Sequence, residues 1–132
     1  MAAISFGESW RQVVDGVKTQ TRRPVRSLER ASRNPAGEIQ SVVRVIQPRY
    51  SVGQVFEVVP VPGVEAVTKV ADIEVTAIRR ENARQISEAD ARAEGFPSAA
   101  EFIRTWNNPA DVWVLEFRVL TTYPDAIAAA QI

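Results

Sequence analysis

The strongest secondary-structure signal in the sequence is a β-strand close to the C-terminal end. Residues 111–120 carry Val, Trp, Leu and Phe in close succession, and β-branched and aromatic residues favour strands. Shorter strand patterns, bounded by Pro, Gly or polar residues, occur at 4–6, 39–46, 54–61 and 69–80. In the last of these, Ile73, Val75 and Ala77 are expected to share the buried face. Pro60, Pro62 and Gly63 are expected to end the third strand, and 48–53 is expected to form a turn.

Helix signals separate the first strands and precede the last one. Ser5-x-x-Glu8 and Ser98-x-x-Glu101 resemble capping boxes, and a third helix is expected to begin at Ser87. Gly16 and Gly95 provide left-handed ends for two of these helices. The resulting order predicts an α+β fold in which a small mixed sheet curls into a β-barrel flanked by helices. Residues 1–120 then form one domain, and the tail 121–132 either makes a loose helical turn or frays.

Composition limits the chemistry that such a domain can support. With 132 residues and 45% hydrophobic content, the chain has room for one core. It contains no Cys and no His, which removes thiol nucleophiles, the usual general base and the commonest transition-metal ligands. We therefore predict no metal and no cofactor, with any catalysis carried by Lys, Glu, Asp, Thr, Ser or Tyr. No membrane-spanning run and no signal peptide are recognisable, so we expect a cytoplasmic protein.

One short stretch, residues 16–24, concentrates reactive side chains. It holds Lys18, two threonines and two arginines directly after a helix-ending glycine, and the chain has only 2 Lys against 14 Arg. A partly buried lysine can lose its proton, whereas an arginine in a protein cannot, so Lys18 is a candidate base. The alternative is an ordinary solvated strand whose basic residues point into water.

Positive charge is concentrated in the N-terminal part of the chain. Residues 1–50 carry nine basic and four acidic residues, a formal charge of +5, while the whole chain is neutral. This asymmetry suits a polyanion such as nucleic acid, although pairing with carboxylates of the other half would explain it equally well. The polar stretch 25–38 is expected to be a long surface loop, and its arginines would suit a flap over a phosphate backbone.

Several motifs in register resemble the ASCH domain, a relative of the PUA fold. They are Gly16-Val-Lys-Thr-Gln-Thr-Arg22, Tyr50-x-x-Gly53 before a strand, Ile86-Ser-Glu-Ala-Asp-Ala-Arg-Ala-Glu94-Gly-Phe, a helix with Phe and Trp, and Trp113-Val-Leu-Glu-Phe117. The match runs from about Ile4 to Leu120, and the layout resembles the small ASCH proteins of phages and prophages, which would work in the host cytoplasm. The resemblance implies a PUA-like barrel whose opening takes RNA or a nucleoside.

Some bacterial ASCH proteins are amidohydrolases that remove the acetyl group of N4-acetylcytidine with a lysine, a threonine and a glutamate. The resemblance places the lysine at Lys18, the nucleophile at Thr21 and the acid/base or lysine-holding carboxylate at Glu94. Backbone amides after Gly16 are then candidates for the oxyanion hole. Lys18 and Thr21 lie three residues apart, so they face opposite sides of an ideal strand and meet only if the backbone turns near Gln20. The alternative for Glu94 is a solvated residue in the last turn of a short helix.

The chain also differs from those hydrolases, and the differences concern substrate size. The hydrolases lack counterparts of the 25–38 and 60–66 segments and carry tyrosine where this chain has Trp113. An arginine-bearing rim favours an oligonucleotide or structured RNA, with Arg22, Arg23 and Arg26 as contacts and Tyr50 or Trp113 for base stacking, unless Trp113 belongs to the core. A non-catalytic RNA-binding module, a ribonuclease-type ASCH protein and a phage protein that binds a host protein remain as alternatives.

Overall fold

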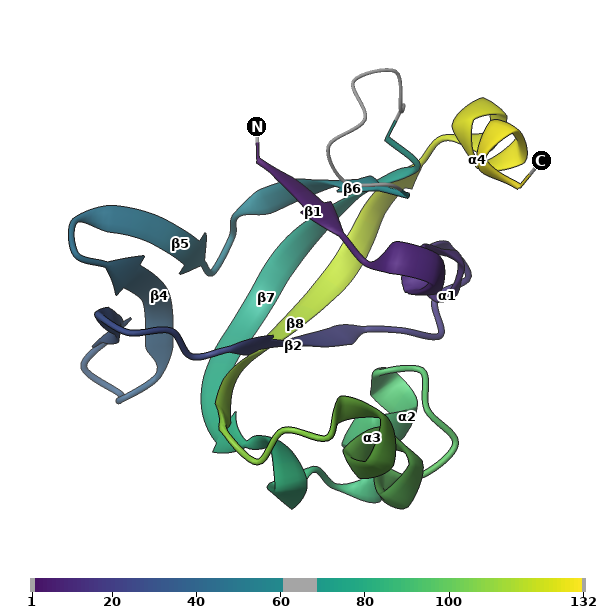
Figure 1. Ribbon diagram of the computed structural model, residues 1–132. Coiled ribbons are helices and arrows are strands. Elements are labelled where there is room, and N and C mark those ends of the chain that lie inside the picture. Colours follow the sequence, from purple (N-terminus) through teal and green to yellow (C-terminus); the bar gives the residue numbers. More distant parts are fainter. Residues whose placement is uncertain (1, 61–68, 132) are drawn as a thin grey trace.

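The computed structural model describes residues 2–60 and 69–131 (Figure 1). Its centre is a long antiparallel pair of strands, β7 (Ala71–Asn82) and β8 (Asp111–Thr122), which run side by side across the molecule. The second edge of β8 pairs antiparallel with β2 (Gln20–Pro24). The second edge of β7 pairs with β6 (Val55–Val59), and β6 pairs in parallel with β1 (Ala3–Ser5).

Three further strands extend this sheet to eight. β4 (Ile39–Arg44) meets β7 at Ile39 and pairs with both β3 (Glu29–Arg33) and β5 (Gln47–Ser51). Among the described residues the pairings do not join into a ring, so the barrel is open. The mixed α+β arrangement predicted from the sequence is confirmed, with an open sheet in place of a closed barrel.

Two register shifts bend the central strands. In the β7–β8 pair they fall between Asp72 and Ile73 and between Val75 and Ala77. Such bulges bend a strand and change which face a side chain takes. Ile73 and Val75 are buried as expected, but after the second shift Ile78 is buried in place of Ala77, which is only half-buried. The expected alternation therefore holds only up to the bulge.

The helices lie at the ends of the sheet. A 3-10 turn (Gly7–Ser9) leads into α1 (Trp10–Val14), and Gly16 follows it with φ +77°. Between β7 and β8 the chain forms a 3-10 turn (Ala83–Gln85), α2 (Glu88–Ala93) and α3 (Ala99–Trp106). The Ser87 and Ser98 hydroxyls cap α2 and α3 as predicted, by accepting from the Asp90 and Glu101 amides. Figure 1 shows α4 (Pro124–Ala130), the helical form of the tail, at the other end of the central pair.

Three sequence predictions are wrong. The 25–38 stretch is not one long loop, because β3 lies inside it and pairs with β4. The 48–53 stretch is mostly the edge strand β5, and the turn comes only at residues 52 and 53. The Ser5-x-x-Glu8 box does not form, because Ser5 lies in β1 and the residue that precedes the first helical turn, Phe6, makes no side-chain cap. The predicted strand end at Val61, Pro62 and Gly63 lies outside the described residues, as does most of the 60–66 segment.

The main core fills the concave side of the bent sheet. It includes Trp10 and Val13 from α1, Phe56 and Val58 from β6, and Trp113 from β8. A smaller cluster under α2 and α3 contains Ile86, Ala91 and Phe102. The segment that leads from α1 into β2 runs between these two clusters, which places residues 16–24 at their junction. In the part of the chain that the structure describes, no helix is long and apolar enough to cross a membrane.

Candidate functional site

Backbone hydrogen bonds hold the segment before β2 between α1 and the end of α2. The Val17 and Lys18 amides donate to the Gln12 carbonyl at 2.9 and 3.0 Å, and the Thr19 amide donates to the Ala93 carbonyl at 2.8 Å. The Gln12 side chain in turn donates to the Gly95 carbonyl at 3.2 Å. Because these bonds tie three separate elements together, the side chains on this segment are held in fixed directions.

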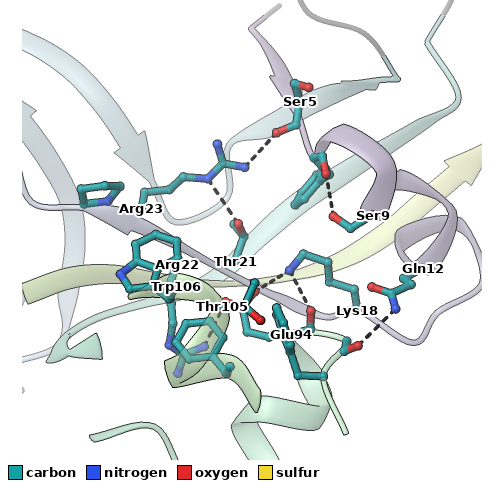
Figure 2. Close-up of a pocket in the computed structure, with 15 residues that line it drawn as sticks. Ser5, Ser9, Gln12, Lys18, Thr21, Arg22, Arg23, Glu94, Thr105 and Trp106 are labelled. Carbon is teal, nitrogen blue, oxygen red and sulfur yellow. Dashed lines mark hydrogen bonds and ion pairs between the residues drawn. The ribbon is translucent and has the colours of Figure 1, made fainter. Parts of the chain in front are cut away.

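A pocket of about 580 Å³ opens at this junction (Figure 2). Its polar lining comes from β1, α1, the segment after α1, β2 and the end of α2, and its apolar lining comes from the segment before α1, from β2 and from the residues around and within α3. The lining residues include Ser5, Gln12, Lys18, Thr21, Arg22, Arg23, Glu94, Phe96, Phe102 and Trp106. The structure therefore brings Lys18, Thr21 and Glu94, which lie up to 76 residues apart in sequence, to one cavity.

Lys18 and Glu94 form a buried ion pair at the inner end of this pocket. Lys18 is 6% exposed and Glu94 is 5% exposed. The Lys18 ammonium donates to the Glu94 carboxylate and, at 3.0 Å, to the Glu94 backbone carbonyl. Glu94 follows α2 directly and precedes Gly95, whose φ of +92° turns the chain back. Glu94 is thus not the solvated helix-end residue of the alternative interpretation.

Lys18 and Thr21 reach the same pocket although they are three residues apart. β2 begins only at Gln20, so Lys18 lies on the irregular segment before the strand and is not bound by strand alternation. Figure 2 shows the Lys18 side chain extending toward Thr21 and Glu94. The Thr21 hydroxyl accepts a hydrogen bond of 3.2 Å from Arg23 Nε. A cation therefore lies next to the oxygen that the sequence marks as a nucleophile.

Arg22 lies behind Glu94 and binds carboxylates. Its side chain is fully buried, and Nη1 donates to Glu94 Oε2 at 3.1 Å. Nη2 donates to Glu81 at 2.6 Å and lies 3.5 Å from Asp90. The predicted nucleic-acid contact at Arg22 is therefore wrong, because its hydrogen bonds go to the protein. Arg22 instead fixes the second oxygen of the carboxylate that holds Lys18.

Burial shifts the pKa of two cations in the pocket. Desolvation lowers the pKa of Lys18, and the nearby Arg23 and Arg22 add to the decrease, while the Glu94 carboxylate opposes it. Desolvation likewise lowers the pKa of Arg23, which has no carboxylate in an ion pair among the described residues. A lysine with a lowered pKa is more easily converted to the free amine, which is the form that accepts a proton.

The remaining predicted nucleic-acid contacts differ in their exposure. Trp113 is 1% exposed and its Nε1 donates to Glu29 at 3.0 Å, so it belongs to the core and the stacking interpretation is wrong. Tyr50 is 8% exposed and borders a second cavity. Arg26 is exposed on the segment after β2 and lines neither cavity. Arg23 borders both cavities, and its role stays a prediction.

An aromatic wall was missed by the sequence analysis. Phe102 and Trp106 stack at 5.8 Å with an interplanar angle of 15°, and Phe96 meets Phe102 edge-on at 5.3 Å. Trp106 Nε1 is buried and has no hydrogen-bond partner among the described residues. The signal was present as a helix with Phe and Trp on one side, but that pattern also describes ordinary core packing. A flat apolar wall beside polar groups is the usual environment for a nucleobase.

The proposed oxyanion hole after Gly16 is wrong. The amides of Val17, Lys18 and Thr19 all donate to backbone carbonyls, so none is available to a ligand. The donor closest to the Thr21 hydroxyl is the Arg23 guanidinium. No cluster of three or more metal-binding side chains occurs within the described part of the chain.

Both explanations of the charge asymmetry apply in part. Lys18 and Arg22 pair with carboxylates from the C-terminal half. By contrast, no ion pair within residues 2–60 and 69–131 involves Arg23, Arg26, Arg30, Arg33 or Arg44. Unbalanced positive charge thus remains around β2, β3 and β4.

Comparison with known proteins gives a result for structure only. No protein-family model matches the sequence, and no curated protein matches it significantly. Among solved structures, a protein of Enterococcus faecalis V583 described by the family model DUF984 is similar, with a TM-score of 0.63, 17% identity, and coverage of 97% of this chain and 82% of that chain.

Two structures named as ASCH proteins are also similar. The ASCH domain from Lactobacillus crispatus JV V101 has a TM-score of 0.59 and 17% identity, over 83% of this chain and 68% of that chain. A mutant of the ASCH protein from Zymomonas mobilis has a TM-score of 0.53 and 14% identity, over 88% of this chain and 66% of that chain. At such identities the likeness is one of fold, and the chain therefore has the fold of the ASCH domains, as its sequence motifs predict.

Proposed function

We propose that this protein is an amidohydrolase that removes an acyl group from the exocyclic nitrogen of a cytidine, in RNA or in a free nucleoside. The observation that carries the proposal is the buried Lys18–Glu94 pair in a pocket that also holds the Thr21 hydroxyl. Burying a lysine lowers its pKa and costs folding free energy, and such perturbed groups concentrate at functional sites. The aromatic wall on the other side of the pocket suits a pyrimidine ring.

In the first half of the reaction Thr21 attacks the acyl carbon. The Thr21 oxygen forms a bond to the carbonyl carbon while its proton passes to the free amine of Lys18. The carbonyl electron pair moves to the former carbonyl oxygen, and the Arg23 guanidinium, which donates to the adjacent Thr21 oxygen, supplies the positive charge that stabilises this oxyanion. The tetrahedral intermediate then collapses with cleavage of the carbon–nitrogen bond, and the Lys18 ammonium returns its proton to the leaving cytosine nitrogen.

In the second half water hydrolyses the acyl-threonine ester. Lys18 takes a proton from the attacking water, acetate leaves, and the proton returns to the Thr21 oxygen, so the enzyme is restored. Glu94 acts by position, because Lys18 binds one of its oxygens and Arg22 binds the other. All four proton transfers thus use Lys18, the only lysine that lines the pocket.

The test is hydrolysis of N4-acetylcytidine by purified protein, followed by separation of cytidine from the substrate. Lys18→Arg keeps the positive charge and removes the base, so we expect a loss of turnover of at least about 100-fold, as for removal of a general base. Thr21→Ala should abolish acyl transfer, whereas Thr21→Ser retains the hydroxyl and should retain measurable turnover. Lys69→Arg is the matched control, because the second lysine pairs with Asp72 far from the pocket and should tolerate the change.

Full activity of Lys18→Arg or Thr21→Ala would contradict the proposal. So would the absence of turnover on N4-acetylcytidine and on an N4-acetylcytidine-containing RNA alike. A non-catalytic RNA-binding module is the second candidate, and the exposed arginines around β3 and β4 favour it. That candidate predicts RNA retention that weakens steeply with salt, no hydrolysis, and no effect of Thr21→Ala on binding.

A further inference from the structure

A second cavity of about 400 Å³ adjoins the candidate active site. It lies between β1, the end of β2, β5 and β6, and it shares Ser5 and Arg23 with the first cavity. Figure 2 shows the Arg23 guanidinium between Thr21 on one side and the Ser5 carbonyl on the other, and Arg23 Nη2 donates to that carbonyl at 3.1 Å. The two cavities therefore share part of their walls, and the Arg23 side chain borders both of them.

The second cavity is positively charged. Among the residues that the structure describes, its charged lining residues are Arg23 and Arg49, and none of its lining residues is a carboxylate. Ser5, Gln47 and Tyr50 add hydroxyl and amide groups to the same wall. Two guanidinium groups with neutral donors and no acid in one cavity are the donor set that binds a phosphate group.

Arg49 is held in place from behind. The Glu29 side chain is fully buried, and its Oε2 lies 3.4 Å from Arg49 Nε. The other oxygen, Oε1, is occupied by the Trp113 indole at 3.0 Å and by the Arg26 amide at 2.7 Å. Arg49 Nη2 donates to the Tyr50 hydroxyl at 3.3 Å, and the guanidinium lies over the Tyr50 ring. One third of the Arg49 side chain is exposed, and Arg49 lines the cavity.

Arg23 forms hydrogen bonds to polar groups, but within the described residues it forms no ion pair with a carboxylate. Its hydrogen bonds go to the Thr21 hydroxyl and the Ser5 carbonyl, both of them neutral groups. A half-buried guanidinium in this state is desolvated without being neutralised, and an anionic ligand would supply the missing countercharge.

We infer that the second cavity binds the phosphate of a nucleotide whose base occupies the first cavity. The inference rests on the proposed function, because only that function places a cytosine in the first cavity. It narrows the substrate class to phosphorylated cytidine, as a nucleotide or within RNA, and it assigns Arg49 as a residue that determines specificity.

The experiment measures binding of the reaction product, so it does not depend on turnover. Isothermal titration calorimetry compares cytidine with cytidine 5′-monophosphate and cytidine 3′-monophosphate. We expect at least one monophosphate to bind about tenfold or more tightly than cytidine, as a charge-assisted contact provides. Arg49→Gln should bring the two affinities to within about twofold of each other, and Arg49→Lys should restore part of the preference.

Arg118→Gln is the matched control. Arg118 also pairs with a single glutamate, Glu74, and it lies on β8 outside both cavities, so the phosphate preference should persist. If Arg49→Gln fails to fold because Glu29 is left buried without its partner, the double variant Glu29→Gln/Arg49→Gln removes both charges and gives the same readout.

Three results would overturn the inference: monophosphates that bind within twofold of cytidine, no measurable binding of either monophosphate, or a phosphate preference that survives loss of Arg49. The two proposals fail separately. Turnover of N4-acetylcytidine without a phosphate preference refutes only the second cavity's role, and a phosphate preference without turnover refutes only the hydrolase.

Discussion

Replacing Arg22 with methionine tests whether the buried charge network holds the pocket together. Arg22 is the cation that joins Glu94, Glu81 and Asp90, and its own side chain is fully buried. Methionine fills much of the same volume but supplies no hydrogen-bond donor and no charge. The substitution therefore leaves a buried carboxylate at Glu94 with Lys18 as its only cation.

The expected loss in free energy of unfolding follows from the burial of the partners. The Glu94 side chain is 4% exposed, whereas Glu81 and Asp90 are 17% and 24% exposed and regain water when Arg22 is removed. Breaking a buried ion pair from one side costs about 3–5 kcal/mol, and the partly exposed partners add little. For a domain of this size the loss corresponds to a decrease in Tm of roughly 10–20 °C.

Urea unfolding followed by tryptophan fluorescence measures the change, with Arg80→Met as the control. Arg80 pairs with Asp111, but the two side chains are 46% and 42% exposed, so the control should lose less than about 1 kcal/mol. The double variant Arg22→Met/Glu94→Gln should recover little of the loss, because it also removes the carboxylate that pairs with Lys18 and leaves a buried lysine without a countercharge. Equal losses for Arg22→Met and Arg80→Met, or full recovery in the double variant, would refute the reasoning.

Three further predictions concern single residues. Burial lowers the pKa of Lys18 below its ordinary 10.5, so the unfolded chain binds more protons between the two values, and the free energy of unfolding should rise with pH there. The kcat/KM for hydrolysis should also rise with pH, because more of Lys18 is then the free amine that accepts a proton. Urea titration at several pH values measures the change in stability with pH, and Lys18→Met should flatten it. Gly95→Ala should lose about 1–2 kcal/mol from its φ of +92°, and its Cβ would displace the Gln12 side chain and break the hydrogen bond to the Gly95 carbonyl. Gly37→Ala, with φ +87° and open space, should show only the backbone cost by thermal melting. Ser87→Ala removes the α2 cap and should cost about 1 kcal/mol in the same assay.

The parts of the fold that were predictable carry their signal in local sequence. Ser87 and Ser98 cap their helices because a hydroxyl three residues before an amide satisfies a group that the helix leaves free. Gly16 ends α1 because glycine reaches φ +77° without strain. The last strand was evident because it carries apolar residues on both faces, and the structure buries Val112, Trp113, Val114, Leu115 and Phe117.

The parts that were missed depend on partners distant in sequence. β3 reads as a loop because only Ala31 packs against the core, while the strand's stability comes from pairing with β4. β5 contains Pro48, which cannot donate to a ladder and therefore reads as a turn, although an edge strand tolerates it. Trp113 was ambiguous because burial of an indole depends on a polar partner, here Glu29, that lies 84 residues away.

The contact between Lys18 and Glu94 was expected only through the family resemblance. The free energy of a buried ion pair explains why no local sequence pattern indicated it. A buried ion pair is rarely more stable than an apolar pair of the same shape, because desolvation offsets the attraction. Stability alone therefore does not account for a lysine and a glutamate at the inner end of a cavity. A function that needs a lysine with a lowered pKa does account for them.

The loss of the Lys18–Glu94 pair as a whole should affect stability much less than the loss of Arg22. The double variant Lys18→Met/Glu94→Gln removes both charges together and leaves Arg22 with Glu81 and Asp90 as partners. Because no charge is left uncompensated, its free energy of unfolding should lie within about 1 kcal/mol of the parent protein, although hydrolysis should be lost. If the double variant is instead as unstable as Arg22→Met, the ion pair stabilises the fold in its own right and gives no reason to place catalysis there.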